Sequence, residues 1–469
     1  MQLAYFMTKN KNIFVRTFIT LCSVFVLLFS AGSFTSCGST KGIEEAPLGT
    51  VEDFTKRYLT NGIPVVYKQN RGSKIVVFRM VFEGGTSALD ASMGGLEDLT
   101  LDLVLRGSEK YSYDTISQLE YEKSFSFTSS SGKDYATAGF VCIQRDLSEV
   151  LAIFSDCMMN PTLSEADYNQ KMTEASSAIA SKKSDPSGAL SLALSKTAFE
   201  GHPYATTSSI TEESYKNLNL NLAKGLYQSL INALRIKFVV VGNFSADLIN
   251  DFTASLEQNF GNIPRKAFSI PKIPKIPVNA KAVRVANEQA GNTGYVAGFF
   301  ECPNRSDDDY IPFAIATMYL DELFFSQVRE KSGAVYSINT GVIGGKEMVG
   351  VISVYKASEK KQLKKLILDA ILSFDGNHLD KYMAQYKNKY ITSLFSSSQT
   401  ASGVANSIVS SMNYLHSESA YLERADLIQQ VATKDVIAAF KKYIEPVAKQ
   451  DAACWVIVDG EENLDDYDF

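Results

Sequence analysis

A proline-rich segment constrains the fold of this chain more than any other feature. Residues 262–278 read NIPRKAFSIPKIPKIPV and contain four prolines. Each proline lacks a backbone donor and stops a helix, so no helical or alternating pattern survives this spacing. Proline-rich segments are typical of extended, semi-rigid spacers. We therefore predict a linker at 261–280, and the 469 residues leave room for a folded domain on each side of it.

The order of expected elements repeats on the two sides of this linker. VFEGGT at 81–86 corresponds to GFFECP at 298–303, and KFVVVGN at 237–243 corresponds to ACWVIVDG at 453–460. Each half mixes strands and helices without strict alternation, which favours α+β layers over a doubly wound sheet. We predict two tandem homologous domains, at 55–260 and 281–460, each a mainly antiparallel sheet with helices packed on it.

Hydrophobic periodicity predicts the individual elements. Strands are expected near 63–66, 75–82, 124–129, 136–143, 238–243, 295–302, 335–343, 348–355 and 454–458. Helices are expected at 115–122, 146–159, 165–182, 188–199, 212–231, 245–258, 310–329, 359–374, 378–394, 403–414 and 432–443. Asp185-Pro186 should separate the third helix from the fourth. The acidic residues 461–469 are expected to form a solvated tail.

The N-terminus has the pattern of an export signal. Lys9, Lys11 and Arg16 precede an apolar run at 18–29, small residues and Cys37. Residues 34–38, FTSCG, resemble a loose lipobox, in which the cysteine becomes the lipidated first residue of a bacterial lipoprotein. We predict a signal at 1–37, a lipid anchor at Cys37 and a polar tether at 38–54, hence an outer-membrane lipoprotein that faces the periplasm or the surface. Plain cleavage between residues 31 and 36 remains the alternative.

The cysteines and the net charge further restrict which class of protein this chain can belong to. The other cysteines of the mature chain lie in apolar contexts without CxxC spacing and should be core thiols: Cys142, Cys157, Cys302 and Cys454. A net charge of −6 argues against a nucleic-acid partner.

Residues 94–108, GGLEDLTLDLVLRGS, combine a glycine entry, an apolar-rich helix and an Arg-Gly-Ser exit. This framework resembles the metal-binding helix of the insulinase/pitrilysin-type zinc metallopeptidase family, which carries His-x-x-Glu-His. On that frame the histidine positions fall on Asp98 and Asp102, and the glutamate position falls on Leu101. The resemblance places the third metal ligand at Ala178. It therefore implies a peptidase scaffold without catalytic residues and without a bound cofactor.

The two aspartates also have a purely structural explanation. Arg106, one turn beyond Asp102, should form an i,i+4 ion pair with it. The core stripe would consist of Leu96, Leu99 and Leu103. An unusual metal site at the aspartates remains the alternative.

Residues 328–337, VREKSGAVYS, resemble the family's Arg-Glu-Lys-x-Gly-Leu-x-Tyr-Ser segment. In the family this arginine and tyrosine hold the backbone of a bound peptide across an enclosed cavity between the domains. The resemblance therefore implies that Arg329 and Tyr336 bind peptide. The turn at 201–204, GHPY, adds to the likeness, which extends over about residues 55–460.

The chain has lost the residues of the metal site but keeps the Arg329–Tyr336 segment. This combination resembles the non-catalytic subunits of two-chain family members. It implies a lipid-anchored, peptide-binding subunit that complements a homologous chain, with zinc in that partner and not here. Two alternatives stay open: a stand-alone peptide-binding or scaffold lipoprotein, and an atypical metallopeptidase.

Overall fold

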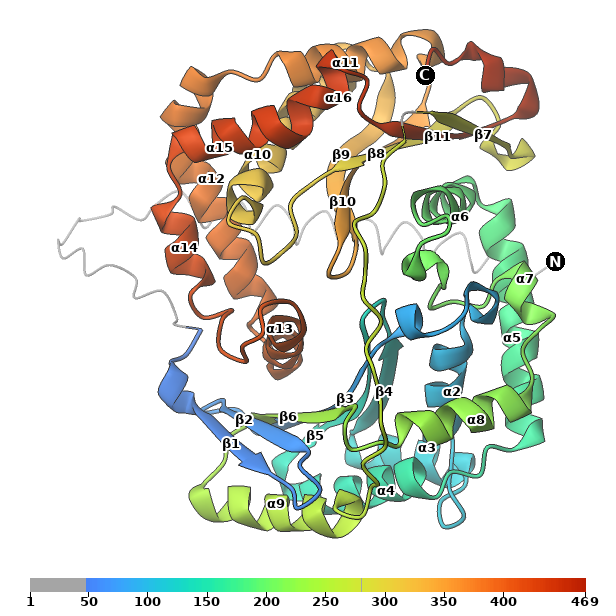
Figure 1. The fold of residues 1–469 in the computed structure, drawn as a ribbon, viewed down its shortest axis with the longest axis vertical. Helices are drawn as coiled ribbons and strands as arrows, with labels where there is room; N and C mark the ends of the chain where they lie inside the picture. The colour runs from blue at the N-terminus through green and yellow to red at the C-terminus, as the bar shows by residue number, and fades with distance from the viewer. Residues whose placement is uncertain (1–47, 280) are drawn as a thin grey trace, which may run out of the picture. The chain divides into compact units, whose positions relative to one another are not determined.

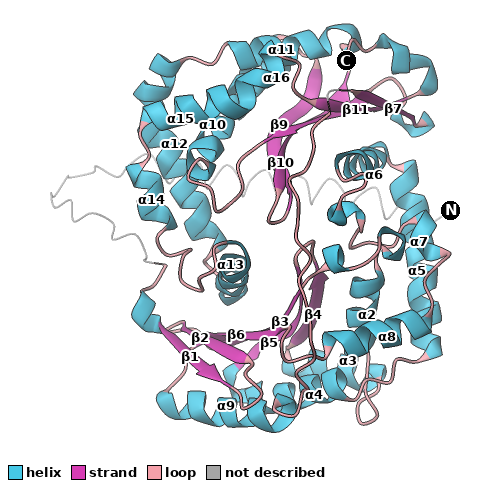
Figure 2. Cartoon of the chain, in the orientation of Figure 1, coloured by secondary structure: helices cyan, strands magenta, loops and turns pink. Residues whose placement is uncertain are grey.

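Two mixed β-sheets form the framework of the chain (Figures 1 and 2). The structure is a computed structural model that describes residues 48–279 and 281–469. The first sheet has the order β1 (Phe54–Tyr58), β2 (Pro64–Gln69), β6 (Ile236–Gly242), β3 (Ile75–Glu83), β5 (Tyr135–Ile143) and β4 (Ser126–Ser131). The second has the order β7 (Ala282–Ala286), β11 (Cys454–Asp459), β8 (Gly294–Glu301), β10 (Met348–Ala357) and β9 (Val335–Gly344).

The two sheets share one topology, which confirms the predicted duplication. In each, one parallel pair (β2 with β6, β7 with β11) is followed by three antiparallel pairings. β3 therefore corresponds to β8 and β6 to β11, as the sequence comparison of the halves predicts. Strand β1 is the one addition to the first sheet, and neither β1 nor β7 was expected from the sequence.

Each sheet buries one face under helices of its own half. The first core includes α2 (Leu96–Leu105), α3 (Tyr113–Lys123), α4 (Leu147–Met159), α8 (Leu220–Leu230) and α9 (Ala246–Phe260). At its centre Phe78 stacks on Phe140 at 5.2 Å and meets Phe154 edge-on at 5.5 Å. The second core includes α10 (Tyr310–Leu323), α11 (Leu363–Leu372), α12 (Gly376–Ser397), α14 (Arg424–Gln430), α15 (Thr433–Ala439) and α16 (Glu445–Lys449).

The opposite face of each sheet is covered by a helix from the other half (Figure 1). Helix α6 (Pro186–Ala198) packs Leu190 and Leu194 against β8, β10 and β11 of the second sheet. Helix α13 (Ala401–Tyr414) packs Ala405 and Ile408 against β2, β3 and β6 of the first sheet. The halves thus exchange one helix each, and residues 48–469 form a single compact unit.

Local signals set several boundaries. Helix α5 (Glu165–Ser184) ends where Asp185 accepts a hydrogen bond from the Gly188 amide and caps α6, with Pro186 in its first turn, as predicted. The helix expected at 212–231 is instead two helices, α7 (Glu212–Tyr215) and α8. Asn219 starts the second by accepting a hydrogen bond from the Leu222 amide.

The linker forms no helix or strand between Phe260 and Ala282 among its described residues. It is nevertheless anchored, because Ile276 is buried in the cluster that covers the second sheet. His202, in the turn after α6, lies with Nε2 2.8 Å from the Pro274 carbonyl oxygen. Its Nδ1 accepts a hydrogen bond from the Tyr204 amide. The 201–204 turn is therefore structural.

The expectation of a solvated acidic tail is wrong for the last residues. Tyr467 is buried and its hydroxyl donates to Asp459, while the Phe469 ring lies 4.6 Å from Trp455. The two aromatic side chains provide apolar area that acidic composition alone does not reveal.

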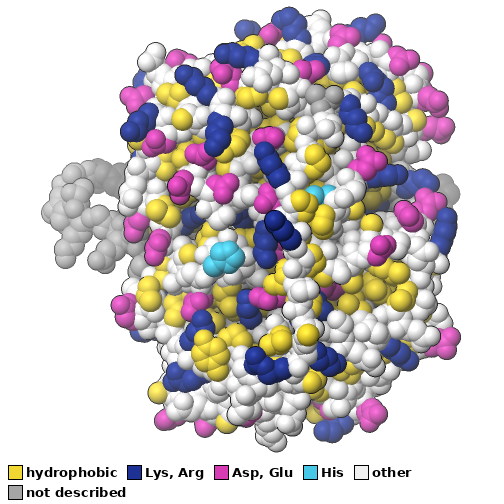
Figure 3. All heavy atoms as spheres, viewed as in Figure 1, with side chains coloured by type: hydrophobic (Ala, Val, Ile, Leu, Met, Phe, Trp, Pro, Cys, Tyr) yellow, Lys and Arg dark blue, Asp and Glu magenta, His cyan; other side chains and the backbone are white. Residues whose placement is uncertain are grey.

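Of the remaining expectations, the one for the cysteines can be compared with the structure, and those for the N-terminal signal and anchor cannot. All four described cysteines are buried and free, as predicted. The predicted signal, Cys37 and the tether up to residue 47 lie outside the described residues. Within the described part, no helix has the length and apolarity to cross a membrane. On the face in Figure 3, acidic and basic side chains are interspersed with apolar ones.

Candidate functional site

Helix α2 carries the positions that correspond to the family's metal site. Its N-cap is Gly95, whose φ of +80° and close approach to Ile210 leave no room for a side chain. Leu96, Leu99 and Leu103 are buried in the first core, which confirms the predicted stripe.

The three degenerate positions have different surroundings. Leu101 is 1% exposed and belongs to the same core, so the position of the family's catalytic glutamate holds a core side chain. Asp98 and Asp102 are half-buried. Burial, together with the charge of Asp102, raises the pKa of Asp98 to about 6, and Lys171 opposes this shift.

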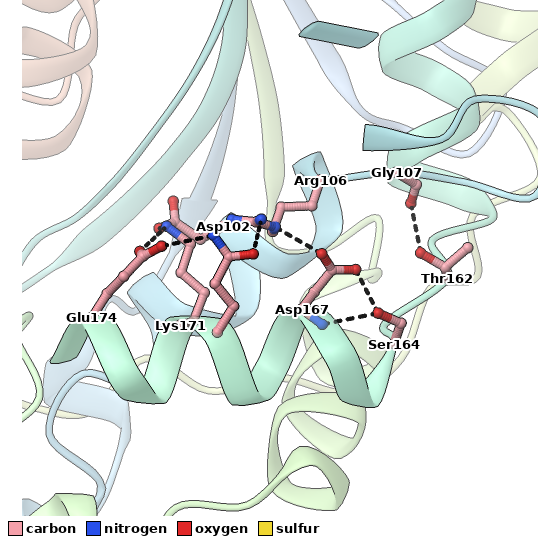
Figure 4. A network of polar contacts seen from close by, with 9 residues as sticks. Asp102, Arg106, Gly107, Thr162, Ser164, Asp167, Lys171 and Glu174 are labelled. Carbon is pink, nitrogen blue, oxygen red and sulfur yellow. Dashed lines mark hydrogen bonds and ion pairs between the residues drawn. The ribbon is translucent and has the colours of Figure 1, made fainter. Parts of the chain in front are cut away.

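A lysine from α5 lies beside Asp102 (Figure 4). Lys171 Nζ lies 3.0 Å from Asp102 Oδ2 and 3.4 Å from Glu174 Oε2. The Ser129 hydroxyl, on edge strand β4, donates to Asp102 Oδ1 at 2.8 Å. Both oxygens of Asp102 are therefore committed within the protein.

The predicted ion pair between Arg106 and Asp102 is wrong. Arg106 instead donates through Nε to Asp167 Oδ1 and through Nη2 to Gln170 Oε1, both at 2.9 Å (Figure 4). Both partners lie on α5, which runs beside α2. A neighbouring helix offered a better-placed carboxylate than the same helix one turn away, and spacing along one helix does not reveal such a partner.

The donor set does not fit zinc. Ala178, the position of the third ligand, is exposed on α5, and the nearby carboxylate of Glu174 pairs with Lys171. The three described histidines lie on different segments: His202 is bound to the linker, His378 of α12 stacks on Tyr319 at 4.9 Å, and His416 follows α13. No group of three or more potential ligands suited to a metal occurs within residues 48–279 and 281–469.

Glu97 belongs to this region although the sequence did not single it out. It is 1% exposed, and its Oε2 accepts a hydrogen bond from Ser131 of β4 at 2.5 Å. Its Oε1 has no partner among the described residues. Burial raises the pKa of Glu97 to about 7, against the opposing effects of the Ser131 hydrogen bond and Arg235. Its position next to Asp98 in the sequence was the one indication that it belongs to this region. Helical periodicity did not predict that its side chain is buried.

Arg329 and Tyr336 are brought together on the second half. Arg329 lies on a π-helical stretch, Phe324–Lys331, that continues α10, and Tyr336 lies on β9, the edge strand. The guanidinium carbon is 5.8 Å from the Tyr336 ring centroid and 5.1 Å from that of Phe325. All three side chains are exposed, Tyr336 by 67%. The pair is thus adjacent and accessible.

Comparison with known proteins gives the same picture over most of the chain. The model described as insulinase (peptidase family M16) matches residues 64–212, and the model described as the peptidase M16 inactive domain matches residues 217–386. The two matches together span more than half of the chain. No curated protein sequence matches.

Solved structures share the fold at low sequence identity. A peptidase M16 inactive domain from Pseudomonas fluorescens has a TM-score of 0.74 and 18% identity, covering 87% of this chain and 98% of that one. A protease from Helicobacter pylori has a TM-score of 0.74 and 14% identity, covering 87% and 99%. The periplasmic protease PqqL of Escherichia coli has a TM-score of 0.74 and 15% identity, covering 92% of this chain and 48% of that one. The chain belongs to the insulinase family of peptidases, M16, as a member that lacks the catalytic motif.

Proposed function

We propose that this chain is a peptide-binding, non-catalytic subunit that complements a separate zinc-bearing peptidase chain. The observation that supports this best is the Lys171–Asp102 ion pair at the former metal position, with buried Leu101 beside it. An ammonium group balances the carboxylate charge but cannot act as a Lewis acid, and leucine cannot accept a proton from water. Hydrolysis would therefore take place on the partner.

The peptide-binding role rests on Arg329 and Tyr336. The guanidinium of Arg329, on the π-helical stretch, and the phenol of Tyr336, on edge strand β9, lie side by side and can donate hydrogen bonds to the carbonyl groups of an extended peptide. Lys356 lies 5.6 Å from the Tyr336 ring and adds positive charge. A peptide with acidic residues or a free C-terminal carboxylate would suit this surface.

The need for a second chain is supported by length. This chain aligns along 92% of its length with only 48% of PqqL, and along 88% with 46% of the ferredoxin protease FusC. A chain of complex III2 from Candida albicans also shares the fold, over 88% of this chain and 99% of that one, with a TM-score of 0.69 and 14% identity. Each of these two proteases is thus about twice as long as the part that this chain matches. We infer that two separate chains form the equivalent pair here.

The test is reconstitution with a zinc-bearing homologue encoded in the same genome. The two chains should co-purify and cleave a quenched fluorescent peptide, whereas this chain alone should not. Arg329→Ala with Tyr336→Phe should raise KM about tenfold or more, because the pair would hold the peptide backbone and not take part in bond cleavage.

A matched control is Arg145→Ala with Tyr121→Phe, both highly exposed and outside this surface. An unchanged KM in the Arg329/Tyr336 variant would remove the pair from the binding site. The absence of any zinc-bearing homologue would leave the stand-alone peptide-binding lipoprotein as the function. Cleavage by the purified single chain, with stoichiometric metal, would favour the atypical peptidase instead.

Export and anchoring form a separate part of the proposal. Cys37 should incorporate a palmitate analogue in cells, and the protein should fractionate with the outer membrane. Cys37→Ser should abolish the labelling and release the protein into the soluble fraction. Labelling that persists in this variant would contradict the assignment of Cys37 as the lipidated residue.

A further inference from the structure

Residues of α12, α13 and the start of α14 line a cavity of about 490 Å³, and these helices lie far along the sequence from the degenerate metal site. Arg305, in the loop after β8, and Tyr310, the first residue of α10, also line it. Its volume is that of a small-molecule site. We call it the arginine–serine cavity, after its two arginines, Arg305 and Arg424, and the serines that α12, α13 and the residues next to them contribute.

The charge of this cavity is one-sided. Arg305 and Arg424 line it, and none of the described lining residues is acidic. Neither arginine has a carboxylate partner within 4 Å in the described part of the chain. Burial and the charge of Tyr135, followed by that of Asp134, raise the pKa of Tyr414 in the cavity wall. Asp134 itself already accepts hydrogen bonds from the Tyr204 hydroxyl and the Lys346 amide.

Aromatic rings hold the two guanidinium groups in place. Arg305 lies over the Tyr414 ring at 5.3 Å, and Arg424 lies over the Tyr310 ring at 4.9 Å. The Arg305 Nη1 atom is also 3.5 Å from the Tyr310 hydroxyl oxygen. Stacked arginines are pre-organised, so they lose little conformational freedom when they bind an oxyanion through paired hydrogen bonds.

Buried polar atoms without partners mark the same cavity. Ser411 Oγ and Tyr421 Oη lack a hydrogen-bond partner in the described chain, although these residues are only 2% and 8% exposed. Arg305 Nε is a third such atom. Buried polar groups are nearly always satisfied in native proteins, so a water molecule or a bound ligand would complete the hydrogen bonding of these three atoms.

We propose that the arginine–serine cavity binds a sugar-sized molecule that carries one phosphate or carboxylate group. Arg305 and Arg424 would hold the oxyanion, and the serine and tyrosine hydroxyls, including Ser411 and Tyr421, would pair with hydroxyl groups of the ligand. This site is independent of the peptide surface at Arg329 and Tyr336, and its test does not depend on a partner chain.

The test is calorimetric titration of the full chain with glucose 6-phosphate, glucuronate, glucose and inorganic phosphate. At least one of the two sugar anions should bind with one-to-one stoichiometry, and glucose should bind at least tenfold more weakly because it lacks the charge. Preference for glucose 6-phosphate would identify a phosphate ligand, and preference for glucuronate a carboxylate ligand.

Variants localise the binding. Arg305→Gln with Arg424→Gln should weaken it at least tenfold, whereas Arg145→Gln, an exposed arginine elsewhere, should not. Ser411→Ala, which keeps both charges, should weaken binding of the sugar anion but not that of inorganic phosphate. Thermal unfolding of each variant confirms that it is folded.

Three results would overturn the proposal. One is no binding of either sugar anion at millimolar concentration. Another is equal affinity in the double arginine variant and the unmodified chain. The third is equal affinity for inorganic phosphate alone and for the sugar anions, which would mean an adventitious ion only.

Discussion

Glu97 is held in a position that opposes its ionisation. It sits in the first turn of α2, is almost completely buried, and makes its one hydrogen bond to Ser131. An ionised carboxylate in such a place loses its hydration, so the folded chain retains the proton up to about pH 7. The unfolded chain releases it near pH 4.5.

This difference predicts a pH-dependent stability. Between about pH 4.5 and 7 the folded state binds more protons than the unfolded state, so the free energy of unfolding falls as pH rises through this window. The contribution of Glu97 is at most about 3 kcal/mol. Chemical denaturation at pH 5 and pH 8 should show a smaller loss for Glu97→Gln than for the unmodified chain. Equal losses would mean that Glu97 titrates normally.

Leu101 gives a second prediction for a single residue. Leu101→Glu restores the family's carboxylate but places a charge in the first core, where the side chain is 1% exposed. We expect it to lower the free energy of unfolding by about 3–5 kcal/mol. Leu234→Glu, at an exposed leucine, is the control and should change it by less than about 1 kcal/mol. A mild effect at Leu101 would show that the helix can turn this position to solvent.

At the scale of elements, the exchanged helices tie the halves together. Ile408 of α13 is fully buried against β2, β3 and β6, although it belongs to the second half of the chain. Ile408→Ala should cost about 2–5 kcal/mol of stability, with loss of hydrogen-exchange protection in β3 and β6. Asn406→Ala on the exposed side of the same helix is the matched control. Protection lost in β10 but not in β3 would contradict the packing.

Sequence patterns predicted most of the helices and strands, but they did not predict which elements pack against one another. Alternation and helical periodicity located the strands other than β1 and β7, and the leucine stripe of α2, because periodicity reports which side of an element is buried. It does not report what covers that side. The apolar side of α6 was therefore visible, but its contact with the second sheet was not.

The same limit applies to the site. The residues that replace the metal ligands could be read from the motif frame, and so could the Arg329–Tyr336 pair. Lys171 could not, because its partner Asp102 lies on another helix 69 positions earlier. Nor could the arginine–serine cavity, because its two arginines are separated by more than a hundred residues, and only the fold brings Arg305, in the loop after β8, to the same cavity as Arg424 of α14.

For the whole molecule, the helix exchange predicts that neither half folds well alone. A fragment of residues 281–469 lacks α6 and would expose Phe299, Val351 and Val456 on the face that α6 covers. It should be aggregation-prone, and so should residues 48–260, which lack α13. Co-expression of residues 48–280 with residues 281–469 should yield a soluble complex with cooperative unfolding. A soluble, cooperatively unfolding fragment of residues 281–469 would contradict this expectation.

The Lys171–Asp102 pair also has a consequence for the dependence of the fold on metal ions. A zinc enzyme is complete only after it has bound its ion, and removal of the ion by a chelator lowers the stability of the fold. In this chain the cation that balances the Asp102 carboxylate is the side chain of Lys171, which is part of the polypeptide itself. The unfolding temperature should be the same after exhaustive chelation and in excess zinc. Equal unfolding temperatures would mean that the fold of this chain does not depend on the supply of zinc.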